Sequence, residues 1–392
     1  MTNGISTGLP RRARRRPTGV PVALGAAGAG TVLLGTLLTT FGLSFDIQWH
    51  SDVGPDTFFT LSHLMLYAGS ALAGLASLVV VLAATARQRQ GRPLPSSIGG
   101  APVRVFGSLF RAPLGYLVTG AGAASFLLFG LLDLGWHAVY GFDAVLNSPP
   151  HIGLFLSITL SMVGSLIVGA AARNSWWGKA SLVISISVLM TFAPITTMAL
   201  DGLSLPLEPL VAGSSLLAAA VLVLAGTVLR RPGSVIVVAV AFGVLQAALW
   251  PFSVWAAHSY ADSIGLPLRD GLTGEPPQLP STMPLFLIVG ALAIELSLHT
   301  VRRRRLSATV ALAWGGAATG LVVGVTLPFQ QVLLDPTEYV PAIAYLVCGI
   351  SGAVLGAAGG FLGLRIGTML SSGPTPATRL DRVASARTAV AS

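Results

Sequence analysis

The sequence Asp46-Ile47-Gln48-Trp49-His50 closes a long apolar run, and Asp133-Leu134-Gly135-Trp136-His137 closes another run further along the chain. In both stretches an aspartate stands four residues before a histidine, and on a helix this spacing places the two side chains on one face. A further histidine follows each stretch after a short loop, His63 in the first copy and His151 in the second. Each copy therefore predicts a helix hairpin that brings one carboxylate and two imidazoles together.

The two copies match one another in order and spacing. Gly54-Pro55 lies in the loop of the first copy and Asn147-Ser148-Pro149-Pro150 in the loop of the second, and such residues end one helix and begin the next. The aspartate, the tryptophan and the first histidine align at one constant offset, and the second histidine at an offset one residue longer. We therefore expect a tandem duplication of a two-helix metal hairpin in the N-terminal half of the chain.

The composition is that of a membrane protein. Of the 392 residues, 53% are hydrophobic and 9% are charged, and the mean hydropathy is +0.78. These values exclude an ordinary soluble domain, and the apolar runs are continuous and long enough to cross a bilayer as helices. The sequence predicts an all-α polytopic membrane protein with about ten transmembrane helices, surrounded by the lipid bilayer.

The expected spans lie at about 20–45, 58–85, 113–136, 150–172, 180–200, 208–229, 234–257, 282–300, 306–329 and 339–366. They divide the chain into four parts. These parts are a basic cytoplasmic tail at 1–18, a four-helix metal-binding unit at 19–175, a six-helix membrane region of unassigned role at 176–371 and a cytoplasmic tail at 372–392.

The net charge is +9, and the basic residues are unevenly distributed along the chain. All of them except Arg269 fall in the tails and in alternate loops, which lie on the same side of the membrane in the expected topology. Such a pattern marks the cytoplasmic side of a membrane and does not indicate nucleic acid binding. We expect a bacterial-type plasma membrane with both termini in the cytoplasm. The acidic residues other than Glu295 and Asp381 fall towards the other side, so both metal sites are expected at the extracytoplasmic face. Cys348 is the only cysteine, which excludes a thiolate metal cluster.

The candidate metal ligands form two sets of one carboxylate and two imidazoles: Asp46, His50 and His63, and Asp133, His137 and His151. These donors suit Cu(II), Zn(II) or Fe(II), and the absence of sulfur from both motifs argues against a soft Cu(I) carrier site. Three protein ligands leave positions open for water, oxygen or substrate. The alternative is that Asp, His and Trp at span ends are solvated in the membrane interface, which the repetition of the whole pattern disfavours.

Other polar residues are secondary candidates. Asp52, Asp56 and Asp143 lie near the motifs, either as acceptors of hydrogen bonds from the imidazole N–H groups or as solvated loop acids. Two further groups lie away from the motifs. Glu295 with His299 is either a functional pair in the membrane or a pair that reaches the membrane interface. His258 with Asp262 and Glu275 is either a third metal or substrate contact or a set of solvated loop residues.

The first motif, with the run Asp56-Thr57-Phe58-Phe59-Thr60-Leu61-Ser62-His63, resembles the metal-binding motif of the C subunit of the particulate methane and ammonia monooxygenases. That subunit has Asp, His and His at this spacing, and its second histidine closes a similar run with serine in place of Phe58 and proline in place of Leu61. The second motif is similar to that subunit's second copper site, where asparagine stands in place of Asp133.

The resemblance covers about residues 46–155. It implies that the two ligand sets bind copper, that a small apolar or nitrogenous substrate is hydroxylated with oxygen, and that other membrane oxygenase subunits are partners. Zinc and iron stay open as alternative metals. The residues also leave open a non-enzymatic copper-handling membrane protein, a zinc-dependent membrane hydrolase with Ser62 as the only adjacent nucleophile, and a bis-histidine haem protein.

The predicted topology is tested by reporter fusions. Fusions after Arg92 and Arg231 should report the cytoplasm, and a fusion near Gly271 should report the outside, because the basic loops stay on the cytoplasmic side. An opposite result at any of the three positions contradicts the ten-span arrangement.

Overall fold

The computed structural model describes residues 19–54, 56–141, 147–198, 208–272, 274–303 and 305–372. Nearly all of the expected tails lie outside these ranges, as do Asp143 and Asp381. Within them, nine helices are long and apolar enough to cross a membrane, which confirms the all-α membrane class. These nine are α1 (Gly19–Asp52), α2 (Leu61–Arg89), α3 (Leu114–Tyr140), α4 (Pro149–Ala171), α5 (Trp176–Met198), α6 (Pro209–Leu229), α7 (Ser234–Ile264), α10 (Ala308–Leu334) and α11 (Ala342–Ser371).

The expected span at 282–300 is not one continuous helix. It is divided into a short α8 (Gln278–Thr282) and α9 (Leu287–Arg302), which has only 16 residues. Pro284 lies in the break, where it cannot donate a helical hydrogen bond and disfavours helical backbone in the residue before it. Because α9 alone is shorter than a typical span of about 20 residues, the described part of the chain does not confirm the count of ten.

Two buried glutamines hold the backbone of this break. The Gln246 side chain on α7 donates to the carbonyl oxygens of Pro280 and Met283, both at 2.9 Å. Gln330 on α10 also donates to the Met283 oxygen at 2.9 Å, and its own side-chain oxygen accepts from the N–H of Leu285 at 2.9 Å. Irregular backbone at membrane depth is tolerated where protein groups satisfy it. The glutamines therefore replace the helical hydrogen bonds that the break removes.

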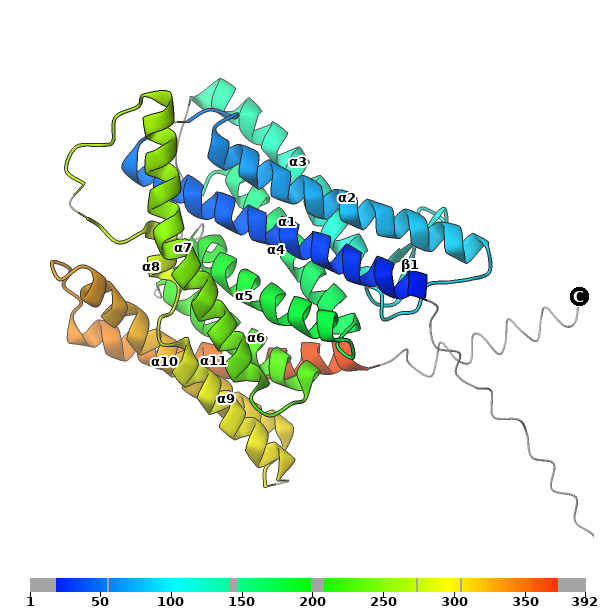
Figure 1. Ribbon diagram of the computed structural model, residues 1–392. Helices are drawn as coiled ribbons and strands as arrows, with labels where there is room; N and C mark the ends of the chain where they lie inside the picture. Colours follow the sequence, from blue (N-terminus) through cyan, green and yellow to red (C-terminus); the bar gives the residue numbers. More distant parts are fainter. Residues whose placement is uncertain are drawn as a thin grey trace, which may run out of the picture.

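The helices pack as two hairpins joined to a larger bundle (Figure 1). The α1–α2 and α3–α4 hairpins contact each other through α2 with α3 and α1 with α4, and α1 also packs on α5 and α7. On the other side, α10 and α11 lie so close that a Cβ on Gly320 would meet the backbone of Gly352. Small residues of this kind permit close contact between membrane helices.

One large hydrophobic cluster crosses the expected boundary between the four-helix unit and the six-helix region. It runs from Leu43 on α1 through Phe155 on α4 and Phe242 on α7 to Leu327 on α10. The two parts are therefore packed together in the structure, and their separation into units stays a prediction from sequence.

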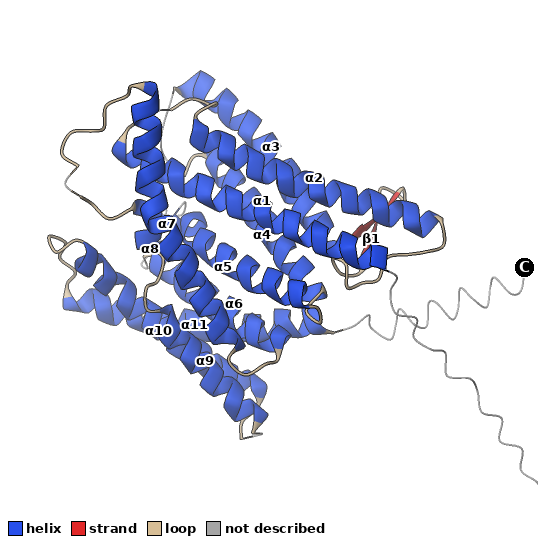
Figure 2. Ribbon diagram, in the orientation of Figure 1, coloured by secondary structure: helices blue, strands red, loops and turns tan. Residues whose placement is uncertain are grey.

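A short β-hairpin that the sequence analysis did not predict joins α2 to α3 (Figure 2). Its strands are β1 (Pro102–Val105) and β2 (Phe110–Pro113), paired antiparallel with Arg104 opposite Arg111. The backbone N–H of Arg111 donates to the Thr85 hydroxyl at 2.9 Å, which attaches the hairpin to α2. Four-residue strands are too short to show a periodic pattern in sequence.

The contribution of Gln330 to the stability of the break between α8 and α9 is tested with Gln330→Leu. The change leaves the Met283 carbonyl with one partner fewer and the Leu285 N–H without its side-chain acceptor, so we expect a loss of about 1–3 kcal/mol in the free energy of unfolding. Denaturant unfolding in detergent micelles measures this loss. Gln331→Leu is the matched control, because Gln331 is the exposed neighbour. Equal stability of the two variants would show that the glutamine does not support the break.

Candidate metal centre

The first cluster forms where α1 ends and α2 begins. Asp46 and His50 lie in the last turns of α1, and His63 lies in the first turn of α2. Gly54 ends α1 with a φ of +133°, a conformation that favours glycine. The chain then returns, so that the start of α2 lies beside the end of α1.

Four side chains converge in this cluster. Nε2 of His63 lies 3.2 Å from Oδ1 of Asp46 and 3.0 Å from Oδ2 of Asp56. Nε2 of His50 lies 3.4 Å from the same Asp56 oxygen and 4.0 Å from Oδ2 of Asp46. Ligand atoms around a tetrahedral ion with bonds of about 2.0–2.1 Å are separated by roughly 3.3 Å. The observed separations are therefore those of donors that can share one ion.

Two carboxylates face one nitrogen of His63, although that nitrogen carries at most one hydrogen. The separations from Asp46 and Asp56 are also longer than those of a charge-assisted hydrogen bond, about 2.7–2.9 Å. A cation placed among the donors would attract both carboxylates and accept the nitrogen lone pair. The four residues lie within 4.8 Å of one another through one ligand atom each, so the cluster could hold a metal ion.

Neighbouring groups orient these donors. Nδ1 of His63 lies 3.0 Å from the backbone carbonyl oxygen of Thr57, which can only accept, so Nδ1 carries the hydrogen and Nε2 is directed at the carboxylates. The Ser62 hydroxyl donates to Oδ1 of Asp46 at 2.7 Å. Hydrogen bonds of this kind fix the tautomer and the direction of metal-binding histidines.

The second cluster repeats this arrangement with three residues. Nε2 of His137, near the end of α3, lies 3.5 Å from Oδ1 of Asp133, and Nε2 of His151, in the first turn of α4, lies 3.4 Å from the same oxygen. Nδ1 of His137 faces the carbonyl oxygen of Gly141 at 3.1 Å. The three residues also lie within 4.8 Å of one another through their ligand atoms. This cluster could likewise hold a metal ion.

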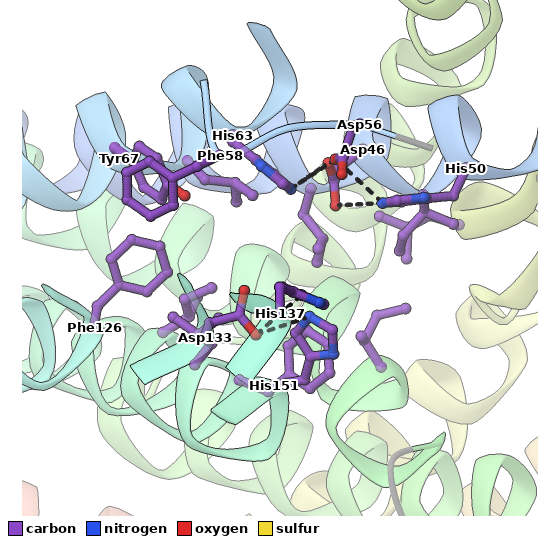
Figure 3. Close-up of a pocket in the computed structure, with 18 of the residues that line it drawn as sticks. Asp46, His50, Asp56, Phe58, His63, Tyr67, Phe126, Asp133, His137 and His151 are labelled. Carbon is purple, nitrogen blue, oxygen red and sulfur yellow. Dashed lines mark ion pairs between the residues drawn. The ribbon is translucent and has the colours of Figure 1, made fainter. Parts of the chain in front are cut away.

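Both clusters line one cavity of about 460 Å³ (Figure 3). In the close-up, Asp46, His50, Asp56 and His63 lie on one wall and Asp133, His137 and His151 on the facing wall. Apart from these ligands, most lining side chains are apolar, and several come from helices beyond the two hairpins. The apolar lining comprises Leu43, Ile47, Phe58, Leu66, Tyr67, Phe126, Leu134, Leu154, Phe155, Ile158, Ile195, Met198 and Leu279.

The structure corrects the expected role of Asp56. The sequence left Asp56 as either an outer acceptor for imidazole N–H groups or a solvated loop acid, whereas its carboxylate faces the Nε2 atoms of His50 and His63 beside Asp46. The backbone carbonyl of Thr57 takes the expected outer position on His63. Asp56 belongs to the same Asp-to-His run that carries the sequence resemblance, and this is the signal that could have identified it.

Asp52 and His258 form a separate pair, which corrects two further expectations. The carboxylate of Asp52 lies 2.7 Å from Nε2 of His258 and accepts from the Gln48 side chain at 2.9 Å. Asp52 therefore joins α1 to α7 and is not an acceptor for the clustered histidines. The partner of His258 is Asp52, in place of the expected Asp262 and Glu275.

The expected pair of Glu295 and His299 is also replaced by other contacts. One oxygen of Glu295 accepts from the backbone N–H of Val235 at the start of α7 at 3.1 Å, and the other accepts from Arg302 at 3.3 Å. A carboxylate at a helix N-terminus is stabilising. Glu295 therefore has a structural role, and His299 is exposed.

The tryptophan of the first motif is buried within the protein. Trp49 is 1% exposed and packs in a cluster with Phe45 and Ala257. Its ring centroid lies 5.1 Å from that of Tyr260 on α7. The Trp49 ring is therefore held by contacts within the protein.

Comparisons of the chain with protein-family models, with characterised proteins and with solved structures gave no match. The resemblance to the monooxygenase C subunit therefore rests on the two motifs alone. What the site can bind and react with therefore depends on its nitrogen and oxygen donors and on the cavity that they line.

The role of Asp56 is tested with Asp56→Asn. Loss of one negative charge among the four donors should lower the metal affinity of the first cluster at least about 10-fold, since even changes behind the ligands commonly cost 10–100-fold. Competition with a chelator measures this affinity. Asp262→Asn, at an exposed position on α7, should leave it unchanged. An unchanged affinity in Asp56→Asn would show that three residues suffice.

Proposed function

We propose that this protein is a copper-binding integral membrane protein similar to a membrane monooxygenase C subunit, and that it takes part in the oxygen-dependent hydroxylation of a small apolar or nitrogenous substrate. The observation that carries the proposal is the pair of three- and four-residue clusters facing one largely apolar cavity. The protein would act as a monooxygenase or as a subunit of one.

The donor sets support copper as the metal. The clusters contain imidazole nitrogens and carboxylate oxygens and no sulfur, a combination that suits Cu(II) better than Cu(I). Met198 also lines the cavity. Zinc and iron accept the same donors, so copper is proposed from the resemblance and from its fit to these residues.

The cavity supports catalysis over transport of the metal. A volume of about 460 Å³ is within the usual range for binding a small molecule, about 300–1,000 Å³, and the apolar walls would receive an apolar substrate. The hydrogen bonds from His63 to Thr57 and from His137 to Gly141 hold both rings in place. Ligands fixed in this way suit a resident metal more than one that is passed on.

Ser62 offers little support for the alternative of a zinc hydrolase. Its side chain is fully buried, and its hydroxyl donates to Asp46 at 2.7 Å. A hydroxyl in this position orients a ligand and is not presented to a substrate as a nucleophile. Ser62, the candidate nucleophile, therefore serves to orient Asp46.

The proposal includes the tandem origin and the orientation of the clusters. In both hairpins the first helix ends with Asp and His and the second begins with His, which supports duplication. The placement of both clusters at the extracytoplasmic face follows from the distribution of basic residues. Further membrane oxygenase subunits are proposed as partners from the resemblance.

The proposal is tested by metal analysis of the purified protein and two variants. His50→Ala should lose the metal of the first cluster and His137→Ala that of the second, because each removes one of the few ligands at its site. Inductively coupled plasma mass spectrometry identifies and counts the metal.

His299→Ala is the control for this experiment, since His299 is exposed and lies in neither cluster. It should keep the full metal content. If the wild-type protein holds no metal, or if both cluster variants keep all of it, the metalloprotein proposal is wrong.

A further inference from the structure

Tyr67 places a phenol beside the first cluster. It follows His63 by one turn of α2, and its ring centroid lies 6.1 Å from that of His63, 5.0 Å from Phe58 and 5.9 Å from Phe126. Tyr67 also lines the shared cavity, and Figure 3 shows it on the same wall as His63, facing Phe126. Aromatic neighbours therefore fix the direction of the ring.

Tyr67 is half-buried and lines the cavity, and its hydroxyl makes no hydrogen bond to the described protein groups. A tyrosine hydroxyl beside apolar surface usually has a hydrogen-bond partner. A molecule within the cavity can supply that partner.

Tyr67 lines the cavity that both clusters share, on the same wall as His63 and across from the wall that carries Asp133. A ligand bound to a metal at either cluster would enter this cavity. Of the described residues that line the cavity, Tyr67 is the only tyrosine.

The second hairpin has a phenylalanine at the matching position. Phe155 follows His151 by one turn of α4, and its ring stacks on the His151 ring with centroids 6.4 Å apart. It lines the same cavity. The two copies thus present the same aromatic neighbour to their second histidine, and only the first copy adds a hydroxyl to it.

We propose that Tyr67 is a ligand-binding residue that donates a hydrogen bond to a small anionic or oxygen-bearing ligand held by metal between the two clusters. The inference rests on the proposed function, because the ligand is attached to the metal of that site. It identifies Tyr67 as the residue that recognises the molecule bound at the open metal positions. Phe155 cannot provide this contact, so the two copies are not equivalent.

The experiment compares azide binding to metal-loaded wild-type protein and to Tyr67→Phe. Azide occupies open metal positions and accepts hydrogen bonds, and its infrared stretch reports binding directly. Tyr67→Phe keeps the ring, as Phe155 does in the second copy, so the fold and the metal content should be unchanged. Loss of one hydrogen bond to an anion should weaken azide binding about 10-fold. Tyr339→Phe, at an exposed loop position, should bind azide as the wild type does.

The outcomes separate this inference from the function on which it rests. Weaker azide binding at full metal content supports the role of Tyr67. Equal affinity in wild type and Tyr67→Phe, with full metal content in both, overturns the role of Tyr67 and leaves the metal site intact. A wild-type protein without metal overturns both proposals, because azide then has no metal to bind.

Discussion

One constraint shapes this structure: a polar group inside an apolar membrane fold is costly unless the protein or a bound species supplies its partner. At the break between α8 and α9, the partners are the side chains of Gln246 and Gln330. At the two clusters, carboxylates and imidazoles face each other at separations that suit a shared cation. The same requirement thus explains the hydrogen bonds at the break between α8 and α9 and the grouping of carboxylates with imidazoles at the two clusters.

Helix α1 connects the site with the rest of the bundle. Its residues Asp46 and His50 line the cavity, whereas Gln48 and Asp52 bond to other helices, as expected for positions two apart on a helix. Gln48 accepts from the backbone N–H of Gln278 at the start of α8, and α8 itself contributes to the cavity wall. The helices after residue 176 therefore have a role that their sequence did not indicate, because they complete the cavity.

The two hairpins share a plan but differ in charge and in polar groups. Each hairpin has one histidine whose Nδ1 faces a backbone carbonyl and whose Nε2 faces an aspartate, but it is the second histidine, His63, in the first hairpin and the first histidine, His137, in the second. Only the first, within the described residues, adds the second carboxylate of Asp56 and the phenol of Tyr67. A site with two carboxylates neutralises more of a metal's charge than a site with one, so the two clusters would hold the same ion in different electrostatic surroundings.

The sequence by itself determined the membrane class, the helix hairpins and two sets of three candidate ligands, because these follow from run length, spacing along a helix and loop residues near one another in the chain. It did not determine that Asp56 faces the ligands, since the path of a loop decides where its carboxylate points. It also could not pair Asp52 with His258, which is 206 positions away. The shared cavity and the broken span were decided by the tertiary structure alone, because both depend on how helices distant in sequence pack against each other.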